Sequence, residues 1–251
     1  MVIRVRLQRM IHVGTSGWQY KDWRGVLYED GLPQDRWLER YAQAFSVVEV
    51  NNSFYRLPER ATFEGWRRRT PAGFTFVVKA SRYLTHLKRL KDAEDGVRLL
   101  WERATGLGNK LGPVLFQLPP RFPADVPRLR EFVSWLPATM RAAFEFRDPS
   151  WMRDEVFSVL DGSGCAFVLA DRPGFRGPLV VTGGWSYIRF HQGTRLGPGY
   201  RRDKLRRWAD RIAALPARDV WAFFNNDHEG AAVRDALFLR DLLERMQARV
   251  A

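Results

Sequence analysis

The chain has little of the residues that build disulfides and metal centres. It contains one cysteine and four histidines in 251 residues. A single cysteine excludes an intrachain disulfide framework and a multi-thiolate metal cluster. Cys165 opens the apolar run Cys165-Ala166-Phe167-Val168-Leu169, so we interpret it as a small buried residue.

Long apolar runs and several cofactor motifs are also missing. No stretch approaches the ~20 apolar residues that span a bilayer, and residues 1–10 lack the apolar core and cleavage site of a secretory signal. We therefore expect a soluble, cytoplasmic protein without a membrane partner. G-x-S-x-G and Walker sequences are absent, and Gly14-Thr15-Ser16-Gly17 is not a dinucleotide-binding fingerprint. The sequence thus predicts no cofactor.

Positive charge is abundant. Lysine and arginine number 41 against 28 aspartates and glutamates, which gives a formal charge of +13. Such a surplus attracts anions and makes nucleic acid or a phosphorylated ligand plausible. A merely solvated arginine-rich surface explains the same number, and composition alone leaves both interpretations open.

Short β-like runs alternate with stretches of helical spacing, as in a parallel sheet covered by helices. The segment 172–184 is too rich in glycine and proline for a helix. We predict an α/β fold: one (β/α)8 TIM-type barrel over residues 1–251, with residues 1–10 as an N-terminal extension and an irregular connection after strand six. An open doubly wound sheet is the alternative. The expected strands are Ile11–Thr15, Val47–Asn51, Phe74–Lys79, Val114–Gln117, Ala142–Phe146, Ala166–Ala170, Ser186–Phe190 and Val220–Phe224.

Polar residues interrupt or end most of these strands. Within a barrel strand, alternate residues face the axis, so polar residues of one parity point inward together. A buried isolated charge costs several kcal/mol, so these groups must pair with one another or with a ligand. A structural ion network is one interpretation. We favour a functional site, because barrel enzymes place their sites at the C-terminal ends of the strands.

The candidates divide into two groups by the chemistry of their side chains. Glu49, Lys79, Glu145 and His191 can transfer protons or attack a substrate, and we predict that they are catalytic. The predicted substrate-binding residues are Trp18, Asn51, Asn52, Tyr55, Arg82, Gln117, Arg147, Trp151, Asp171, Arg189, Asn225 and Asn226.

The same residues lie in motifs that occur together in one family. The motifs are Gly14-Thr15-Ser16-Gly17-Trp18, Glu49-Val50-Asn51-Asn52-Ser53-Phe54-Tyr55, Phe76-Val77-Val78-Lys79-Ala80-Ser81, Leu115-Phe116-Gln117-Leu118-Pro119-Pro120, Phe144-Glu145-Phe146-Arg147, Arg189-Phe190-His191 and Phe224-Asn225-Asn226. In this order, from Ile11 to Leu243, the chain resembles the YecE-like family, domain of unknown function 72. The resemblance implies a TIM-type barrel and the location of its site, but no particular reaction.

One departure from the family pattern follows His191. The family has Gly-Arg at this point, and this chain has Gln192-Gly193. An arginine contact to phosphate or carboxylate is therefore not carried over there, although Arg195 lies close in sequence.

Three alternatives stand beside the function that we favour. A metal site from Glu49, Glu145, Asp171 and His191 is disfavoured, because Lys79, Arg147 and Arg189 would repel the cation. A glycoside hydrolase could use Glu49 and Glu145, with Trp18, Tyr55 and Trp151 stacking on a sugar. A non-catalytic ligand-binding barrel is a further alternative.

We favour an enzyme that acts on an anionic, phosphate-containing substrate, with a nucleic-acid-processing hydrolase as its sharpest form. The expected partner is an anionic small molecule or single-stranded nucleic acid, which the basic segments 84–91 and 201–207 would hold. We also expect Glu145 and Arg147 to serve function more than folding, so that Glu145→Gln keeps a near-normal melting temperature. The sequence predicts no oligomeric state.

Overall fold

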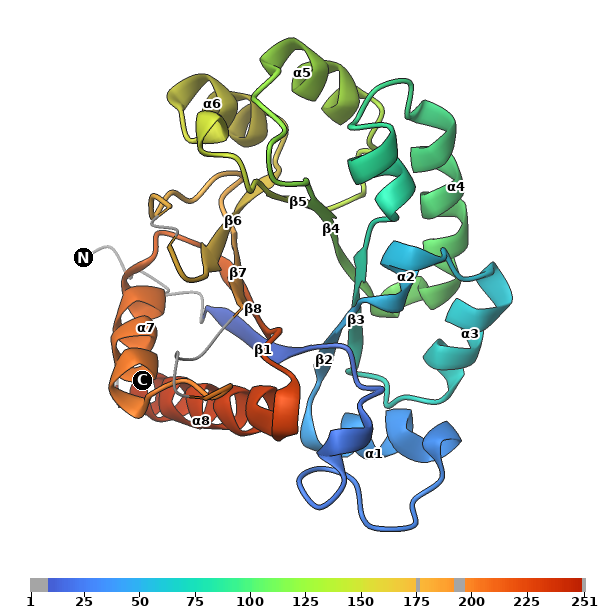
Figure 1. Ribbon diagram of the computed structural model, residues 1–251, viewed down its shortest axis with the longest axis vertical. Coiled ribbons are helices and arrows are strands. Elements are labelled where there is room, and N and C mark those ends of the chain that lie inside the picture. The colour runs from blue at the N-terminus through green and yellow to red at the C-terminus, as the bar shows by residue number, and fades with distance from the viewer. Residues whose placement is uncertain (1–8, 175–176, 192–196, 250–251) are drawn as a thin grey trace, which may run out of the picture.

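Eight parallel strands close into a barrel in sequence order (Figure 1). The structure, a computed structural model, describes residues 9–174, 177–191 and 197–249. The predicted fold class is confirmed, and the open sheet is excluded because β8 pairs with β1. The strands are β1 (Met10–Ser16), β2 (Val47–Val50), β3 (Thr75–Lys79), β4 (Leu111–Gln117), β5 (Ala142–Glu145), β6 (Ala166–Asp171), β7 (Ser186–Phe190) and β8 (Asp219–Phe224).

The helices lie outside the ring of strands (Figure 1). Between β6 and β7 the described residues form no helix, in agreement with the irregular connection predicted from the glycines and prolines of that segment. In the parts of the chain that the structure describes, no helix is both long and apolar enough to cross a membrane. The helices are α1 (Trp37–Ala44), α2 (Asn52–Tyr55), α3 (Arg60–Arg68), α4 (Glu94–Ala104), α5 (Val126–Ser134), α6 (Asp154–Gly162), α7 (Arg202–Ala214) and α8 (Ala231–Ala248).

Two apolar clusters hold the barrel together. The larger lies between strands and helices, where for example Phe144 stacks on Phe116 and Phe146 stacks on Trp151. The smaller fills the barrel interior, as expected for a packed barrel core. Its members are Val47, Val77, Leu115, Ala143, Ala166, Val168, Trp185, Tyr187, Trp221 and Phe223.

Strands β1 and β2 approach closely at Gly14. A Cβ at this position would lie 2.4 Å from the backbone oxygen of Val47. Glycine is therefore required where these strands meet. The register pairs Ser16 with Glu49 at the C-terminal end of the two strands, and this pairing begins the candidate site.

Candidate functional site

A layer of polar side chains caps the interior cluster. On six strands, an apolar residue of that cluster is followed two positions later by a polar residue. Because side chains alternate between the two faces of a strand, the polar residue shares the inward face and lies one step nearer the C-terminal end. The pairs are Val47 and Glu49, Val77 and Lys79, Leu115 and Gln117, Ala143 and Glu145, Tyr187 and Arg189, and Phe223 and Asn225. With Ser16, Arg147 and His191, these polar residues form what we call the polar layer.

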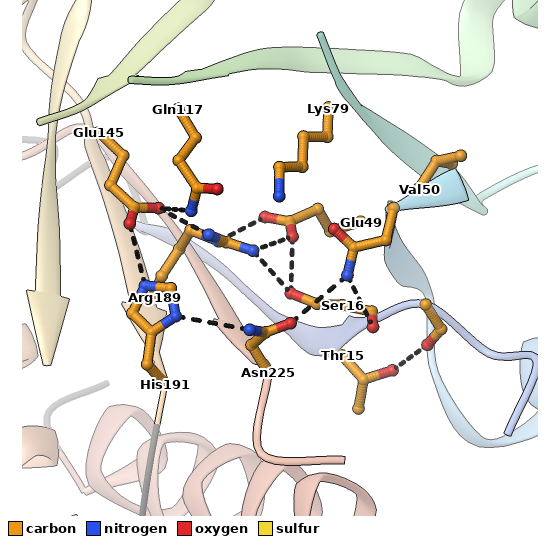
Figure 2. Close-up of polar contacts among 12 residues, drawn as sticks. Thr15, Ser16, Glu49, Val50, Lys79, Gln117, Glu145, Arg189, His191 and Asn225 are labelled. Carbon is orange, nitrogen blue, oxygen red and sulfur yellow. Dashed lines mark hydrogen bonds and ion pairs between the residues drawn. The ribbon is translucent and has the colours of Figure 1, made fainter. Parts of the chain in front are cut away.

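Arg189 joins the two carboxylates of the polar layer (Figure 2). Its Nε and Nη2 donate to the two oxygens of Glu49 at 3.0 and 2.7 Å, and its Nη1 donates to Glu145 Oε2 at 2.6 Å. The hydroxyls of Ser16 and Tyr187 each donate to a Glu49 oxygen at 2.6 Å. These bonds fix Arg189 and leave Glu49 with a partner on each oxygen.

Glu145 is equally surrounded by donors. Its Oε2 also accepts from Gln117 Nε2 at 2.8 Å, and β4 and β5 pair these two residues in register. Its Oε1 accepts from Arg147 Nε at 3.2 Å and lies 3.1 Å from His191 Nε2. Both Glu145 and Glu49 are completely buried. Their carboxylates thus anchor the surrounding cations.

Both carboxylates stay ionised despite burial. Burial opposes ionisation of Glu49, but the charges of Arg189 and Lys79 outweigh it and lower the pKa. For Glu145, burial is outweighed by Arg189, His191 and Arg147, and the pKa lies well below its ordinary value. A carboxyl group with such a low pKa is a poor general acid.

Lys79 differs from the other buried charges of the polar layer. Its side chain is 8 % exposed and points toward the Glu49–Arg189 contact (Figure 2). Within the described residues its amine makes no hydrogen bond or ion pair, and its contact is with the ring of Phe54, 4.2 Å from Nζ. Burial and then the charge of Arg189 lower the pKa of Lys79 to about 8.

The short helix α2 holds Phe54 beside this lysine. Ser53 Oγ lies 2.9 Å from the backbone oxygen of Val50 and 2.7 Å from that of Lys79. These contacts connect α2 to the ends of β2 and β3. The position of the Phe54 ring over the amine therefore follows from the local fold.

His191 and Asn225 continue the network toward the mouth. His191 Nδ1 lies 3.4 Å from Asn225 Nδ2, and Asn51 Nδ2 donates to Asn225 Oδ1 at 3.4 Å and to the Ser16 backbone oxygen at 3.2 Å. The structure thus brings together Glu49, Asn51, Lys79, Gln117, Glu145, Arg147, Arg189, His191 and Asn225. Gln192, Gly193 and Arg195 lie outside the described residues.

A histidine of the basic segment 84–91 lies close to this network. His86 packs edge-on against Phe54, with ring centroids 5.0 Å apart, and Thr85 Oγ1 lies 2.9 Å from its Nδ1. Burial and then the charges of Lys79 and Arg147 lower the pKa of His86. It lies on a single π-turn, Tyr83–Leu87, a geometry that is frequent at functional sites.

Two predicted aromatic contacts are wrong. Trp18 is 4 % exposed and packs edge-on against Trp66 and Phe76, between the strands and α3. Trp151 is fully buried, and its Nε1 donates to the Phe122 backbone oxygen at 2.6 Å. Both side chains belong to the outer apolar cluster, so neither can stack on a ligand in the mouth.

Two predicted polar contacts also lie away from the barrel axis. Asp171 has the outward parity of β6 and binds α7, accepting from Trp208 Nε1 at 3.0 Å and pairing with Lys204 at 2.8 Å. Asn226 donates to the Asp235 carboxylate of α8 at 2.9 Å. Their contacts join strand ends to helices, so the structure does not bring them to the polar layer, and their substrate-binding role stays a prediction.

Asn52, Tyr55 and Arg82 lie at the rim. All three are exposed, and the side chain of Tyr55 is 75 % exposed. Tyr55 packs edge-on against Phe54, with centroids 5.2 Å apart. Their place at the strand ends is as predicted, and their binding role stays a prediction.

Sequence reasoning missed Ser16 and Tyr187 as members of the network. Tyr187 precedes Arg189 by two residues, so parity alone could have placed it inward. Ser16 ends β1 opposite Glu49.

Among the described residues, no group of three or more His, Cys, Asp or Glu side chains is arranged to hold a metal ion.

A separate cleft of about 720 Å³ lies outside the polar layer. We call it the outer cleft. It is bounded by loops that follow β3, β4 and β5, and its lining includes Arg89, Phe122, Arg128, Arg130 and Arg153. Arg128 is paired with Asp125 at 3.1 Å. Asp125 and Glu155 also line the outer cleft, and its four arginines outnumber them. The outer cleft is therefore a competing cationic surface for an anion.

Comparison with known proteins decides the family. Residues 12–251 match the family model described as "Protein of unknown function DUF72". The chain belongs to the DUF72 family. It is 26 % identical to UPF0759 protein YunF of Bacillus subtilis over 94 % of this chain and 95 % of YunF. It is 30 % identical to UPF0759 protein YecE of Escherichia coli K12 over 57 % of this chain and 50 % of YecE.

Solved DUF72 structures share the barrel. A DUF72 protein of Thermotoga maritima superposes with a TM-score of 0.85 at 29 % identity, covering 94 % of this chain and 100 % of that one. A second, from Enterococcus faecalis, gives 0.80 at 20 % identity over 94 % and 96 % of the two chains. The YecE-like resemblance and the barrel predicted from sequence are both confirmed.

Proposed function

We propose that the mouth of this barrel binds a small phosphate-containing anion and hydrolyses a phosphate ester there. The charge of the polar layer is the observation that carries the proposal. Glu49 and Glu145 supply two negative charges against three positive ones from Lys79, Arg147 and Arg189. The network therefore keeps one net positive charge, which an anion would neutralise.

Arg147 and Lys79 have hydrogen-bond donors that the described residues do not use. Arg147 uses only its Nε on Glu145, and within the described residues its two Nη groups make no side-chain hydrogen bond or ion pair. The Lys79 amine is likewise without a hydrogen bond among those residues. Phosphate oxygens match the donors of guanidinium and ammonium groups. Arg189, fixed between two carboxylates, serves instead to position them.

His191 can move a proton in such a reaction. If Glu145 accepts the Nε2 proton across 3.1 Å, the Nδ1 lone pair is left to accept another. The contact from Asn225 to Nδ1, at 3.4 Å, is long enough for a water or ligand hydroxyl to replace it. His191 would then act as the base that activates water.

A glycoside hydrolase has weaker support. It needs one protonated carboxyl group as general acid, whereas Arg189 holds both Glu49 and Glu145 ionised. Two of the aromatic residues suggested for sugar stacking, Trp18 and Trp151, are buried in the outer apolar cluster.

A single-stranded nucleic acid is the extended form of the proposed ligand. Tyr55 and Tyr83, which follow β2 and β3, are 75 % and 48 % exposed and offer rings for stacking bases. The basic helix α7 offers less, because Arg207 pairs with Asp203 and Lys204 pairs with Asp171. We therefore place the ligand over the mouth rather than along α7.

Calorimetric titration with inorganic phosphate tests the binding site. Arg147→Gln removes a charged donor from the mouth and should weaken binding by about tenfold or more, the equivalent of one charge-assisted hydrogen bond. Arg141→Gln is the matched control, because Arg141 pairs with Asp219 at 2.8 Å at the opposite end of the barrel. Equal weakening in both variants, or no phosphate binding by the wild type, would contradict the proposal.

Two further assays test the reaction and the extended ligand. The wild type should release nitrophenol from bis(4-nitrophenyl) phosphate, and His191→Asn should reduce that turnover by about a hundredfold, the usual contribution of a general base. If turnover does not exceed the rate in buffer, the protein binds the anion without hydrolysing it.

Fluorescence anisotropy with single-stranded DNA should show binding at about 50 mM salt that falls steeply as salt rises.

A further inference from the structure

Lysine is a rare residue in this chain, whose positive charge is carried mainly by arginine. The lysines are Lys21, Lys79, Lys88, Lys91, Lys110 and Lys204. Arginine stays protonated in proteins, whereas a buried lysine can lose its proton and become a nucleophile. A lysine among the arginines of the polar layer therefore introduces a chemistry that its neighbours do not have.

The surroundings of Lys79 leave its amine available. The oxygens of Glu49 are taken by Arg189, Ser16 and Tyr187. Glu145, the other carboxylate, is bound to Gln117, Arg189 and Arg147 in the same way. Within the described residues, the Lys79 amine has only the Phe54 ring, 4.2 Å from Nζ.

Lys110 shows what a structural buried lysine looks like in the same chain. It is 6 % exposed, close to the 8 % of Lys79. Its Nζ donates to the backbone oxygens of Arg67 and Thr70 at 2.7 and 2.6 Å, and to Thr70 Oγ1 at 3.1 Å. All three donor positions of Lys110 are therefore used, in contrast to those of Lys79.

Burial lowers the pKa of both lysines, so the contrast between them lies in their hydrogen bonds. Burial and the charge of Arg189 lower the pKa of Lys79 to about 8. About a fifth of its amine is then neutral at pH ~7.4, against about a thousandth for an ordinary lysine. Desolvation next to a second cation is an established way to activate a lysine as a nucleophile.

We propose that Lys79 is a carbonyl-reactive amine, which forms an imine with an anionic aldehyde or ketone bound in the mouth. The Nζ lone pair forms a bond to the carbonyl carbon, and the carbonyl oxygen takes up a proton. Both protons that the oxygen gains come, in net, from the amine nitrogen, so the oxygen leaves as water, the C–O bond breaks and the C=N bond forms, without an oxidant or reductant. The inference rests on the proposed function, since Arg147 would hold the phosphate or carboxylate of the same molecule.

Reductive trapping tests the proposal on the wild-type protein. The native chain is treated with glyoxylate and cyanoborohydride, and carboxymethylation of each lysine is followed by peptide mass spectrometry. Lys79 should be modified at least tenfold faster than the exposed Lys91 and the buried Lys110, with a rate that rises around pH 8. Modification of Lys79 no faster than that of Lys91 would overturn the proposal.

Further measurements separate this inference from the proposed anion site. Arg147→Gln should slow glyoxylate trapping at Lys79 but leave trapping of neutral acetaldehyde unchanged. Fast acetaldehyde trapping without any glyoxylate preference would support the reactive amine and contradict the anion site. Slow trapping by both carbonyl probes, in a protein that binds inorganic phosphate, would contradict the reactive amine and support the anion site. Lys79→Arg keeps the charge and should abolish the fast modification, whereas Lys110→Arg should not alter it.

Discussion

Replacing Glu145 by glutamine tests how the polar layer is held together. The carboxylate accepts from Gln117 and Arg189 through Oε2 and faces Arg147 and His191 through Oε1. An amide has a single oxygen, so its NH₂ group must face one of these pairs of donors. The substitution also removes one of two buried negative charges, which leaves Glu49 alone against three cations.

The expected cost follows from these lost contacts. Breaking a buried ion pair by removing one partner costs about 3–5 kcal/mol, which corresponds to a drop in Tm of about 6–20 °C for a chain of this size. The near-normal melting temperature expected from sequence is revised accordingly, because four donors converge on this one carboxylate. Thermal and urea denaturation at pH 7 measure the effect. Glu131→Gln, on the exposed face of α5, is the control and should change stability by less than about 0.5 kcal/mol.

The pH dependence gives the same experiment a second readout. Because the pKa of Glu145 is lowered in the folded chain, its stabilising contribution is fully present above the unfolded value of about 4.3. That contribution is lost as the pH falls through the folded-state pKa. The stability gap between wild type and Glu145→Gln should therefore shrink below pH ~4.3. Equal stability at pH 7, or a gap that is unchanged in acid, would mean that the ionised Glu145 carboxylate does not stabilise the polar layer.

The other predictions concern single contacts. Tyr187→Phe removes a donor from Glu49 and should lower the free energy of unfolding by about 1–3 kcal/mol in urea denaturation; an unchanged value would mean that the hydroxyl is dispensable. Trp151→Ala should cost about 3–5 kcal/mol through the cavity it leaves, yet any folded protein should bind phosphate with wild-type affinity by calorimetry. Weaker phosphate binding would indicate that Trp151 contributes to the binding site. His86→Gln should slow turnover of bis(4-nitrophenyl) phosphate without lowering Tm, and loss of stability with full turnover would make His86 structural.

The barrel was predictable because its strands carry apolar residues on the outward face and polar residues at the C-terminal end of the inward face. Phe144 and Phe146 pack outward, while Glu145 between them faces the axis. The boundaries were predicted less well. Strand β4 begins at Leu111, three residues before the expected start, because Gly112 and Pro113 hide the strand signal.

The polar layer was predictable wherever strand parity applies. Glu49, Lys79, Gln117 and Arg189 lie within strands, and their inward direction follows from alternation. Trp18 and Asn226 lie two residues beyond strand ends, and Trp151 lies in a short helical turn after β5, where alternation no longer fixes direction. Trp18 packs against Trp66 of α3, Trp151 bonds to Phe122, and Asn226 bonds to Asp235 of α8. Strand alternation predicts none of these contacts.

His86 could not be assigned for a related reason. Its position depends on a π-turn, followed by Arg89 and Leu90 at positive φ of 48° and 68°. Non-glycine residues adopt this conformation only where the surrounding structure imposes it. A segment that reads as a basic, solvated loop in sequence therefore folds back to the mouth.

The position of a bound anion is the most direct test of the proposed binding site in the mouth of the barrel. A crystal of this protein soaked in tungstate, a heavy analogue of phosphate, would reveal the anion by its anomalous signal. We expect a peak over the polar layer, within hydrogen-bonding distance of Lys79 Nζ and the Nη groups of Arg147, that disappears in Arg147→Gln. Peaks confined to the outer cleft at Arg89, Arg128, Arg130 and Arg153, with none in the mouth, would contradict it.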